Sequence, residues 1–111
     1  MVVTAANMAS MVEILIGLQV TDERGYAAYR AHMTPLLSAH GGSFGVDVRV
    51  AEVLKNPGEQ PFNRLFTIRF PSWSAHDAFF ANPEYQAVRR RFFEPSVAHT
   101  ARFGRYEVLA P

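Results

Sequence analysis

Hydrophobic and polar residues alternate along four stretches of the chain, and this alternation predicts four β-strands. A strand has a side-chain period of two, so successive residues face opposite sides of a sheet. The second stretch is the clearest case, because every second residue from Phe44 to Val50 is apolar. The first stretch is rich in β-branched residues, which favour strands. The predicted strands span residues 12–20, 43–54, 63–70 and 103–109.

Apolar residues recur every three to four positions over residues 23–40, and this spacing predicts a helix there. Thr21 and Asp22 are suitable N-cap residues, and a glycine pair at positions 41 and 42 is suited to end the helix. Pro35 lies inside the pattern and predicts a kink. The apolar stripe of this helix comprises Tyr26, Tyr29, Met33, Leu36, Leu37 and His40.

A second helical region follows the third strand in two pieces, divided at Asn82 and Pro83. Asparagine is a good N-cap and proline fits the first helical turn, so a helix restarts there. Pro95 ends it, and we expect residues 92–101 to form a loop that lines a cleft or runs over the surface. The inner face of the restarted helix comprises Tyr85, Val88 and Phe92.

These elements follow the order β-α-β-β-α-β. This is the order of the split β-α-β, ferredoxin-like fold, an α+β architecture with a four-stranded antiparallel sheet. A chain of 111 residues suits one domain, which we assign to residues 11–111. Residues 1–10 lack the basic and apolar regions of a signal peptide and are expected to form a loose tail.

The period of two divides the sheet into two faces. The face expected beneath the helices comprises Val12, Ile14, Ile16, Leu18, Phe44, Val46, Val48, Val50, Phe66, Ile68, Phe70, Tyr106 and Val108. The opposite face, which includes Arg105 and Glu107, mixes apolar residues with charges of both signs. Either solvent or a second copy of the chain covers it, and its leucine and phenylalanine residues favour a homodimer. The expected dimer contacts are Glu13, Leu15, Asp47, Arg49, Arg69 and Phe103.

Composition narrows the classes of function. The formal net charge is only +1, whereas proteins that bind nucleic acid or membrane surfaces carry a clear positive excess, so neither partner is expected. No stretch approaches the roughly 18 apolar residues that span a bilayer. The absence of cysteine excludes disulfides, thiolate metal sites and cysteine nucleophiles, and it is compatible with a cytoplasmic location.

Candidate chemistry is confined to scattered histidine, tyrosine and arginine residues. The four histidines lack the i, i+4 spacing of a metal pair, so no metal and no cofactor is expected. They are interpreted as surface or half-buried side chains. His40 lies on the inner stripe, where it could serve as a general base or a haem ligand, and a helix-end histidine stabilised by the negative end of the helix dipole is the alternative. The arginines at 89–91 spread around a helix and are expected to be solvated.

The candidate catalytic residues are His40, Tyr29 and Arg30, and the candidate substrate-binding residues are Tyr26, Tyr85 and Trp73. A cleft between helices and sheet would let the tyrosines orient a small aromatic or keto substrate. Core packing is the alternative for the tyrosines, and Trp73 then packs as a lid over the start of a helix.

Two stretches resemble the domain-of-unknown-function family 1330: YAAYRAHMTPLLSAHGGSFGVDVRVAEVLK and NRLFTIRFPSWSAHDAFFANPEYQAVRRRFF. The most characteristic pieces are Tyr29-Arg30, Gly41-Gly42, Phe70-Pro71-Ser72 and Asn82-Pro83-Glu84-Tyr85. The resemblance covers about residues 12–109. It implies a dimeric α+β barrel, a superfamily whose relatives include monooxygenases, polyketide cyclases and dehydratases, and haem-handling proteins. It implies no particular reaction.

Two hypotheses about function follow. The first is a small-molecule enzyme or binder of the monooxygenase or cyclase type, with a cleft between helices and sheet. The second is a non-catalytic dimeric module for ligand sensing or protein contact, which is favoured by the lack of a nucleophile or cofactor motif. The sequence leaves open which ligand is bound and whether oligomers larger than a dimer form.

Overall fold

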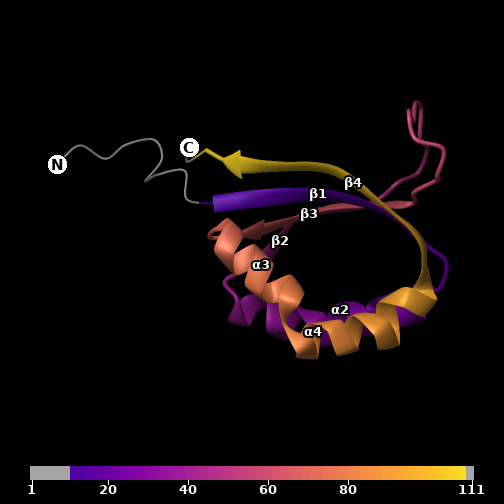
Figure 1. Ribbon diagram of the computed structural model, residues 1–111. Helices are drawn as coiled ribbons and strands as arrows, with labels where there is room; N and C mark the ends of the chain where they lie inside the picture. Colours follow the sequence, from indigo (N-terminus) through magenta and orange to yellow (C-terminus); the bar gives the residue numbers. More distant parts are fainter. Residues whose placement is uncertain (1–10, 110–111) are drawn as a thin grey trace.

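The computed structural model describes residues 11–109 as one four-stranded antiparallel sheet with helices on one face (Figure 1). The strands are β1 (Met11–Val20), β2 (Ser43–Arg49), β3 (Arg64–Phe70) and β4 (Val97–Val108). The helices are α2 (Glu23–Ala39), α3 (Trp73–Ala81) and α4 (Pro83–Val88). The strand order β2-β3-β1-β4 confirms the predicted split β-α-β, ferredoxin-like architecture. The tail expected at residues 1–10 lies outside the described residues.

Local signals begin and end the helices where the sequence predicts. Asp22 Oδ1 accepts a hydrogen bond from the backbone N–H of Gly25 at 3.0 Å, and Asn82 Oδ1 accepts one from Glu84 at 2.8 Å. Gly41 follows α2 with a φ of 76°, the left-handed conformation that glycine adopts at little cost. These capping residues therefore determine at which residue each helix begins or ends.

The core lies between the helices and the two central strands, β1 and β3. Four residues of the predicted α2 stripe are buried, whereas His40 at its end is only half-buried. The buried hydrophobic residues are Val12, Ile14, Leu18, Val20, Tyr26, Tyr29, Met33, Leu37, Phe66, Ile68, Phe70, Phe79 and Tyr85. Burying apolar area of this kind stabilises a domain by roughly 25 cal/mol per Å².

The predicted face of β2 is wrong beyond Phe44. A β-bulge shifts the register with β3 between Phe44 and Asp47. Asp47 then lies opposite Phe66, a residue of the helix-facing side, so Asp47 faces the helices too. Val46 and Val48 are 61% and 43% exposed instead of lying in the core.

Strand β4 is longer than predicted, because most of the expected loop at 92–101 has regular structure. A π-helical segment (Arg89–Phe93) and a short 3₁₀ turn (Glu94–Ser96) lead directly into the strand. β4 then pairs with β1 from Val97 to Val108. This segment closes one side of the space between helices and sheet, as Figure 1 shows.

A second bulge reverses the predicted faces at the end of β4. The register shift leaves Phe103 without a partner residue on β1. Arg105 consequently pairs with Ile14 on the helix-facing side, whereas Tyr106 pairs with Glu13 on the outer face. The predicted positions of Glu107 and Val108 are exchanged for the same reason: one extra residue inverts the alternation.

The outer face carries four of the six expected dimer contacts, namely Glu13, Leu15, Arg69 and Phe103. Asp47 and Arg49 lie on the helix-facing side, because the β2 bulge shifts both. Glu13 accepts hydrogen bonds from Arg69 Nη2 at 3.2 Å and from Tyr106 Oη at 2.5 Å. The outer face therefore has a polar centre at Glu13, and the half-exposed Phe103 ring lies further along β1, over Gly17.

Substitution of Gly42 tests the packing of α2 against the sheet. A Cβ atom at this position would lie 2.9 Å from Leu37 Cγ and 3.1 Å from Phe70 Cε1, and both side chains are buried. We expect Gly42→Ala to lower the free energy of unfolding by about 1–3 kcal/mol, the usual effect of overpacking. Gly58→Ala is the matched control, since its nearest neighbour is Asn56 Oδ1 at 3.4 Å. If the two variants unfold at the same urea concentration, the close packing of Gly42 against Leu37 and Phe70 is contradicted.

Candidate functional site

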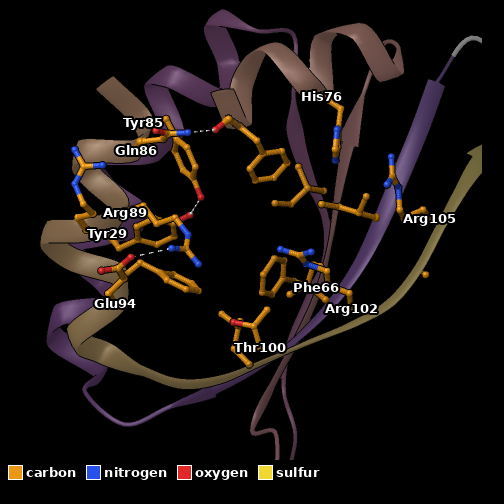
Figure 2. Close-up of a pocket in the computed structure, with 18 residues that line it drawn as sticks. Tyr29, Phe66, His76, Tyr85, Gln86, Arg89, Glu94, Thr100, Arg102 and Arg105 are labelled. Atoms are coloured by element: carbon orange, nitrogen blue, oxygen red, sulfur yellow. Dashed lines mark hydrogen bonds and ion pairs between the residues drawn. The ribbon is translucent and has the colours of Figure 1, made fainter. Parts of the chain in front are cut away.

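A cavity of about 660 Å³ lies between the helices and the helix-facing side of the sheet (Figure 2). Its floor is apolar and consists of Ile14, Ile16, Leu18, Phe66 and Ile68. These residues share one face because they alternate along the paired strands β1 and β3. The volume falls within the range of about 300–1,000 Å³ typical of sites for small organic molecules.

The helices form the opposite wall, where two tyrosine hydroxyls meet. Tyr29 from α2 and Tyr85 from α4 have their oxygen atoms 2.8 Å apart, as Figure 2 shows. The two residues are 5% and 3% exposed. The ring of Phe93 packs on Tyr29 with 5.0 Å between ring centroids. The aromatic contact with Phe93 and the mutual hydrogen bond therefore hold the two hydroxyls in one position beside the apolar floor.

The two hydroxyls are neutral hydrogen-bond donors at ordinary pH. Burial raises the pKa of Tyr29 above its usual value of 10.0, and proximity to Tyr85 raises it further. Burial also raises the pKa of Tyr85, although the hydrogen bond with Tyr29 and the charge of Arg89 oppose part of this shift. Two neutral hydroxyls carry two protons, and only one bridges the pair. The other proton can be donated to an oxygen atom of a ligand.

Two residues of the arginine run line the cavity, and all three are at least partly exposed to solvent, as predicted. Arg89 and Arg90 line it, and Arg89 Nη1 lies 3.0 Å from Glu94 Oε1. Arg91 lies instead over the ring of Phe92, with 4.9 Å between the guanidinium carbon and the ring centroid. A π-helical turn takes more residues than an α-helical turn, so neighbouring side chains diverge less and two of the arginines share one side.

Strand β4 supplies the remaining polar lining. Arg102 pairs with Ile16 and Arg105 with Ile14, so both lie next to the apolar floor. The guanidinium carbon of Arg105 lies 4.6 Å from the centroid of the Trp73 ring, a cation–π contact. Since β4 is an edge strand, these arginines stand at the rim of the cavity and are exposed to solvent.

His76 is a lining residue that the sequence did not single out. Its Nδ1 lies 2.8 Å from Asp77 Oδ1, and its ring packs edge-on against Phe80 and Trp73. A carboxylate at Nδ1 favours the tautomer in which Nε2 is free to accept a proton. The signal in the sequence was the helical stripe at three- and four-residue spacing on which Trp73, His76 and Phe80 lie.

The structure separates the residues that the sequence grouped as catalytic. Tyr29 and Tyr85 line the cavity together, and Trp73 lies next to its rim through Arg105 and His76. His40 lies outside the lining, with Nδ1 2.8 Å from the carbonyl oxygen of Leu36. That contact is typical of a histidine at the end of a helix.

Arg30 and Tyr26 belong to a separate polar cluster between α2 and strands β2 and β3. Arg30 Nη2 and Arg64 Nε lie 3.2 Å and 3.0 Å from Asp47 Oδ1, and Arg30 Nε donates to Tyr26 Oη at 2.7 Å. Partial burial opposes ionisation of Asp47, yet hydrogen bonds and charges from Arg64 and Arg30 lower its pKa. These side chains satisfy one another, which assigns them to holding the helix on the sheet.

Residues 14–103 match the family described as a domain of unknown function (DUF1330). The chain belongs to the DUF1330 family. This confirms the resemblance found in the sequence, and it places the cavity lining from Ile14 to Arg102 inside the family region. No curated protein matches this DUF1330 chain.

Solved structures share its fold at low sequence identity. RPA0582, a protein of unknown function from Rhodopseudomonas palustris, is 18% identical with a TM-score of 0.73, over 93% of this chain and 85% of that one. SnoaB, a cofactor-independent oxygenase from Streptomyces nogalater, is 12% identical with a TM-score of 0.62, over 92% and 96%. A dimeric protein of unknown function with a ferredoxin-like fold from Bacteroides fragilis is 15% identical with a TM-score of 0.59, over 89% and 97%.

Metal ligation and membrane insertion can both be assessed for residues 11–109. Within them, no group of three or more histidine, aspartate or glutamate residues is arranged to hold a metal ion. No helix in the same range is long and apolar enough to cross a membrane.

The raised pKa values of Tyr29 and Tyr85 predict a loss of stability in alkali. Above the ordinary tyrosine pKa of 10.0 the unfolded chain releases phenolic protons that the folded chain retains, so the free energy of unfolding falls as pH rises. Each pH unit between the unfolded and folded pKa corresponds to about 1.4 kcal/mol per tyrosine. Urea unfolding across this range should show a smaller loss in Tyr29→Phe/Tyr85→Phe. Identical slopes for wild type and variant would contradict the assignment.

Proposed function

We propose that this DUF1330 protein is a small-molecule enzyme that binds a compact organic substrate in the cavity between helices and sheet. The observation that carries the proposal is the buried Tyr29–Tyr85 pair, which places a neutral hydroxyl donor above an apolar floor. Apolar pockets with a few convergent polar groups are the usual form of small-molecule sites. A packed core would instead fill this space with side chains.

The lining supports acid–base chemistry on a carbonyl or phenol. His76 Nε2 accepts a proton from the substrate, with Asp77 on the far side of the ring as a positioning residue. The electron pair of the broken bond moves to the substrate oxygen, to which the tyrosine pair donates a hydrogen bond. The proton returns to substrate carbon or oxygen from the same histidine. These steps balance with the residues of the chain alone.

Among the similar structures, SnoaB supports this choice, because its description as a cofactor-independent oxygenase shows that the fold can host chemistry performed without a cofactor. At 12% identity the likeness concerns the fold, so the particular reaction rests on the cavity residues. The monooxygenase or cyclase type is a narrower version of the same proposal.

Proton exchange offers a test that does not require the natural substrate. We expect a panel of aromatic ketones in D₂O to contain compounds that raise the melting temperature and exchange their α-protons faster with the protein than in buffer, as followed by ¹H NMR. His76→Gln should slow this exchange by about 10²–10⁴-fold, the usual contribution of a general base. His40→Gln is the matched control, since His40 lies outside the cavity lining.

The outcomes separate the two hypotheses about function. If compounds bind but none of them exchanges its α-protons faster than in buffer, the protein is a non-catalytic ligand-sensing module and the enzyme hypothesis is wrong. Exchange that is equally slowed by His76→Gln and His40→Gln would contradict the role of His76. If no compound of the panel raises the melting temperature, the cavity is not a binding site for this class.

We also infer that the chain forms a homodimer through the outer face of the sheet. This face combines the hydrogen bonds of Arg69 and Tyr106 to Glu13 with exposed aromatic rings, a mixture of polar and apolar groups that suits contact with a second copy. Phe103 and Tyr106 on the same face are 44% and 40% exposed. The ferredoxin-like protein from Bacteroides fragilis is dimeric, which supports a dimer of this fold.

Phe103→Asp tests this dimer. A carboxylate in the apolar part of the contact loses buried area and adds an unpaired charge, so we expect a monomer at micromolar concentration by analytical ultracentrifugation. Leu54→Asp, an identical charge change at a side chain that is 88% exposed in the β2–β3 connection, should leave the dimer intact. A monomeric wild type, or a dimeric Phe103→Asp variant, would refute the pairing.

A further inference from the structure

The cavity carries much more positive charge than the chain as a whole. Its lining contains four arginines, at positions 89, 90, 102 and 105, and one carboxylate, that of Glu94. The lining thus has a formal excess of three positive charges, whereas the whole chain has a net charge of only +1. The excess is therefore a local property of this site.

Only one of these arginines is neutralised within the site. Arg89 forms an ion pair with Glu94 at 3.0 Å. Among residues 11–109, no carboxylate forms an ion pair with Arg90, Arg102 or Arg105. Arg105 is held by the Trp73 ring, but a cation–π contact leaves the N–H donors at the edge of the guanidinium available.

Arg102 is placed to receive a ligand that lies on the floor. Its backbone pairs with Ile16, a floor residue that is only half-buried, and its side chain lines the cavity on the sheet side, across from the tyrosine pair (Figure 2). A guanidinium presents donors in a flat fork that matches the two oxygens of a carboxylate or sulfonate. An apolar body and one acidic group would thus be recognised at the same time.

We infer that the substrate is an organic anion, with an apolar, planar body on the floor and its acidic group on Arg102 at the β4 rim. The inference rests on the proposed function, since it concerns the same cavity, and it adds the charge of the substrate. Placement of the acidic group at the rim keeps it partly hydrated. It also directs the other end of the molecule toward the tyrosine hydroxyls on the opposite wall.

Two fluorescent probes with the same aromatic body test the inference. 1-Anilinonaphthalene-8-sulfonate carries one sulfonate, and N-phenyl-1-naphthylamine is its uncharged counterpart. We expect the sulfonate to bind at least about tenfold more tightly at low ionic strength, since a hydrogen-bonded charge pair contributes more than a neutral contact. Its affinity should fall as salt is added, and that of the neutral probe should not.

Arg102→Gln should weaken binding of the sulfonate about tenfold and leave the neutral probe unchanged. Arg91→Gln is the matched control, because it removes the same charge from a side chain that stacks on Phe92 outside the cavity lining. Arg102 is exposed on an edge strand, so the variant should fold, and its melting temperature verifies this. Arg105→Gln gives a second measurement at the same rim.

Equal affinities for the two probes, with no effect of Arg102→Gln or Arg105→Gln, would overturn the anionic substrate while leaving a neutral-substrate enzyme intact. Equal weakening by Arg91→Gln would also overturn it, because the effect would then come from the overall charge. If neither probe binds, the inference fails together with the proposed cavity site. A selective loss of sulfonate binding at Arg102 and Arg105 is the result that supports it.

Discussion

The close approach of Phe103 to Gly17 determines which side chains of β4 reach the cavity. A Cβ atom at Gly17 would lie 2.6 Å from the Phe103 ring, so the ring fits over β1 only because that position has no side chain. Phe62 packs on the same ring with 5.1 Å between centroids. The extra residue of the bulge lies at this contact. Beyond it the alternation inverts, and an arginine comes to face the helices.

The same inversion explains the contrast between the two faces of the sheet. Arg105 stacks on Trp73 at the cavity rim, while Tyr106 crosses to the outer face and donates to Glu13. Without the bulge, the outer face would gain Arg105 and lose the Tyr106–Glu13 hydrogen bond. One unpaired residue in an edge strand thus contributes to both the charge of the cavity and the polar centre of the proposed dimer contact.

The arginines of the chain occupy two different electrostatic settings. Arg30 and Arg64 converge on Asp47, so their donors are largely satisfied and tie α2 to the sheet. The rim arginines, Arg102 and Arg105, face an apolar floor and have no such carboxylate among residues 11–109. A positive charge that has no carboxylate partner and lies beside an apolar surface favours a ligand that supplies both an anion and a hydrophobic body. This difference separates a structural cluster from a binding site made of the same residue type.

The amino-acid sequence by itself determined the element order, the helix caps, the split β-α-β fold and the family, because period, turn chemistry and capping are local properties. It also predicted Tyr29 and Tyr85 as candidate site residues. Only the tertiary structure decided the faces of Asp47, Arg49 and Arg105, since a bulge changes register without changing the alternation visible in the sequence. It likewise decided that His76, rather than His40, stands at the cavity, because that depends on how two helices pack over one sheet.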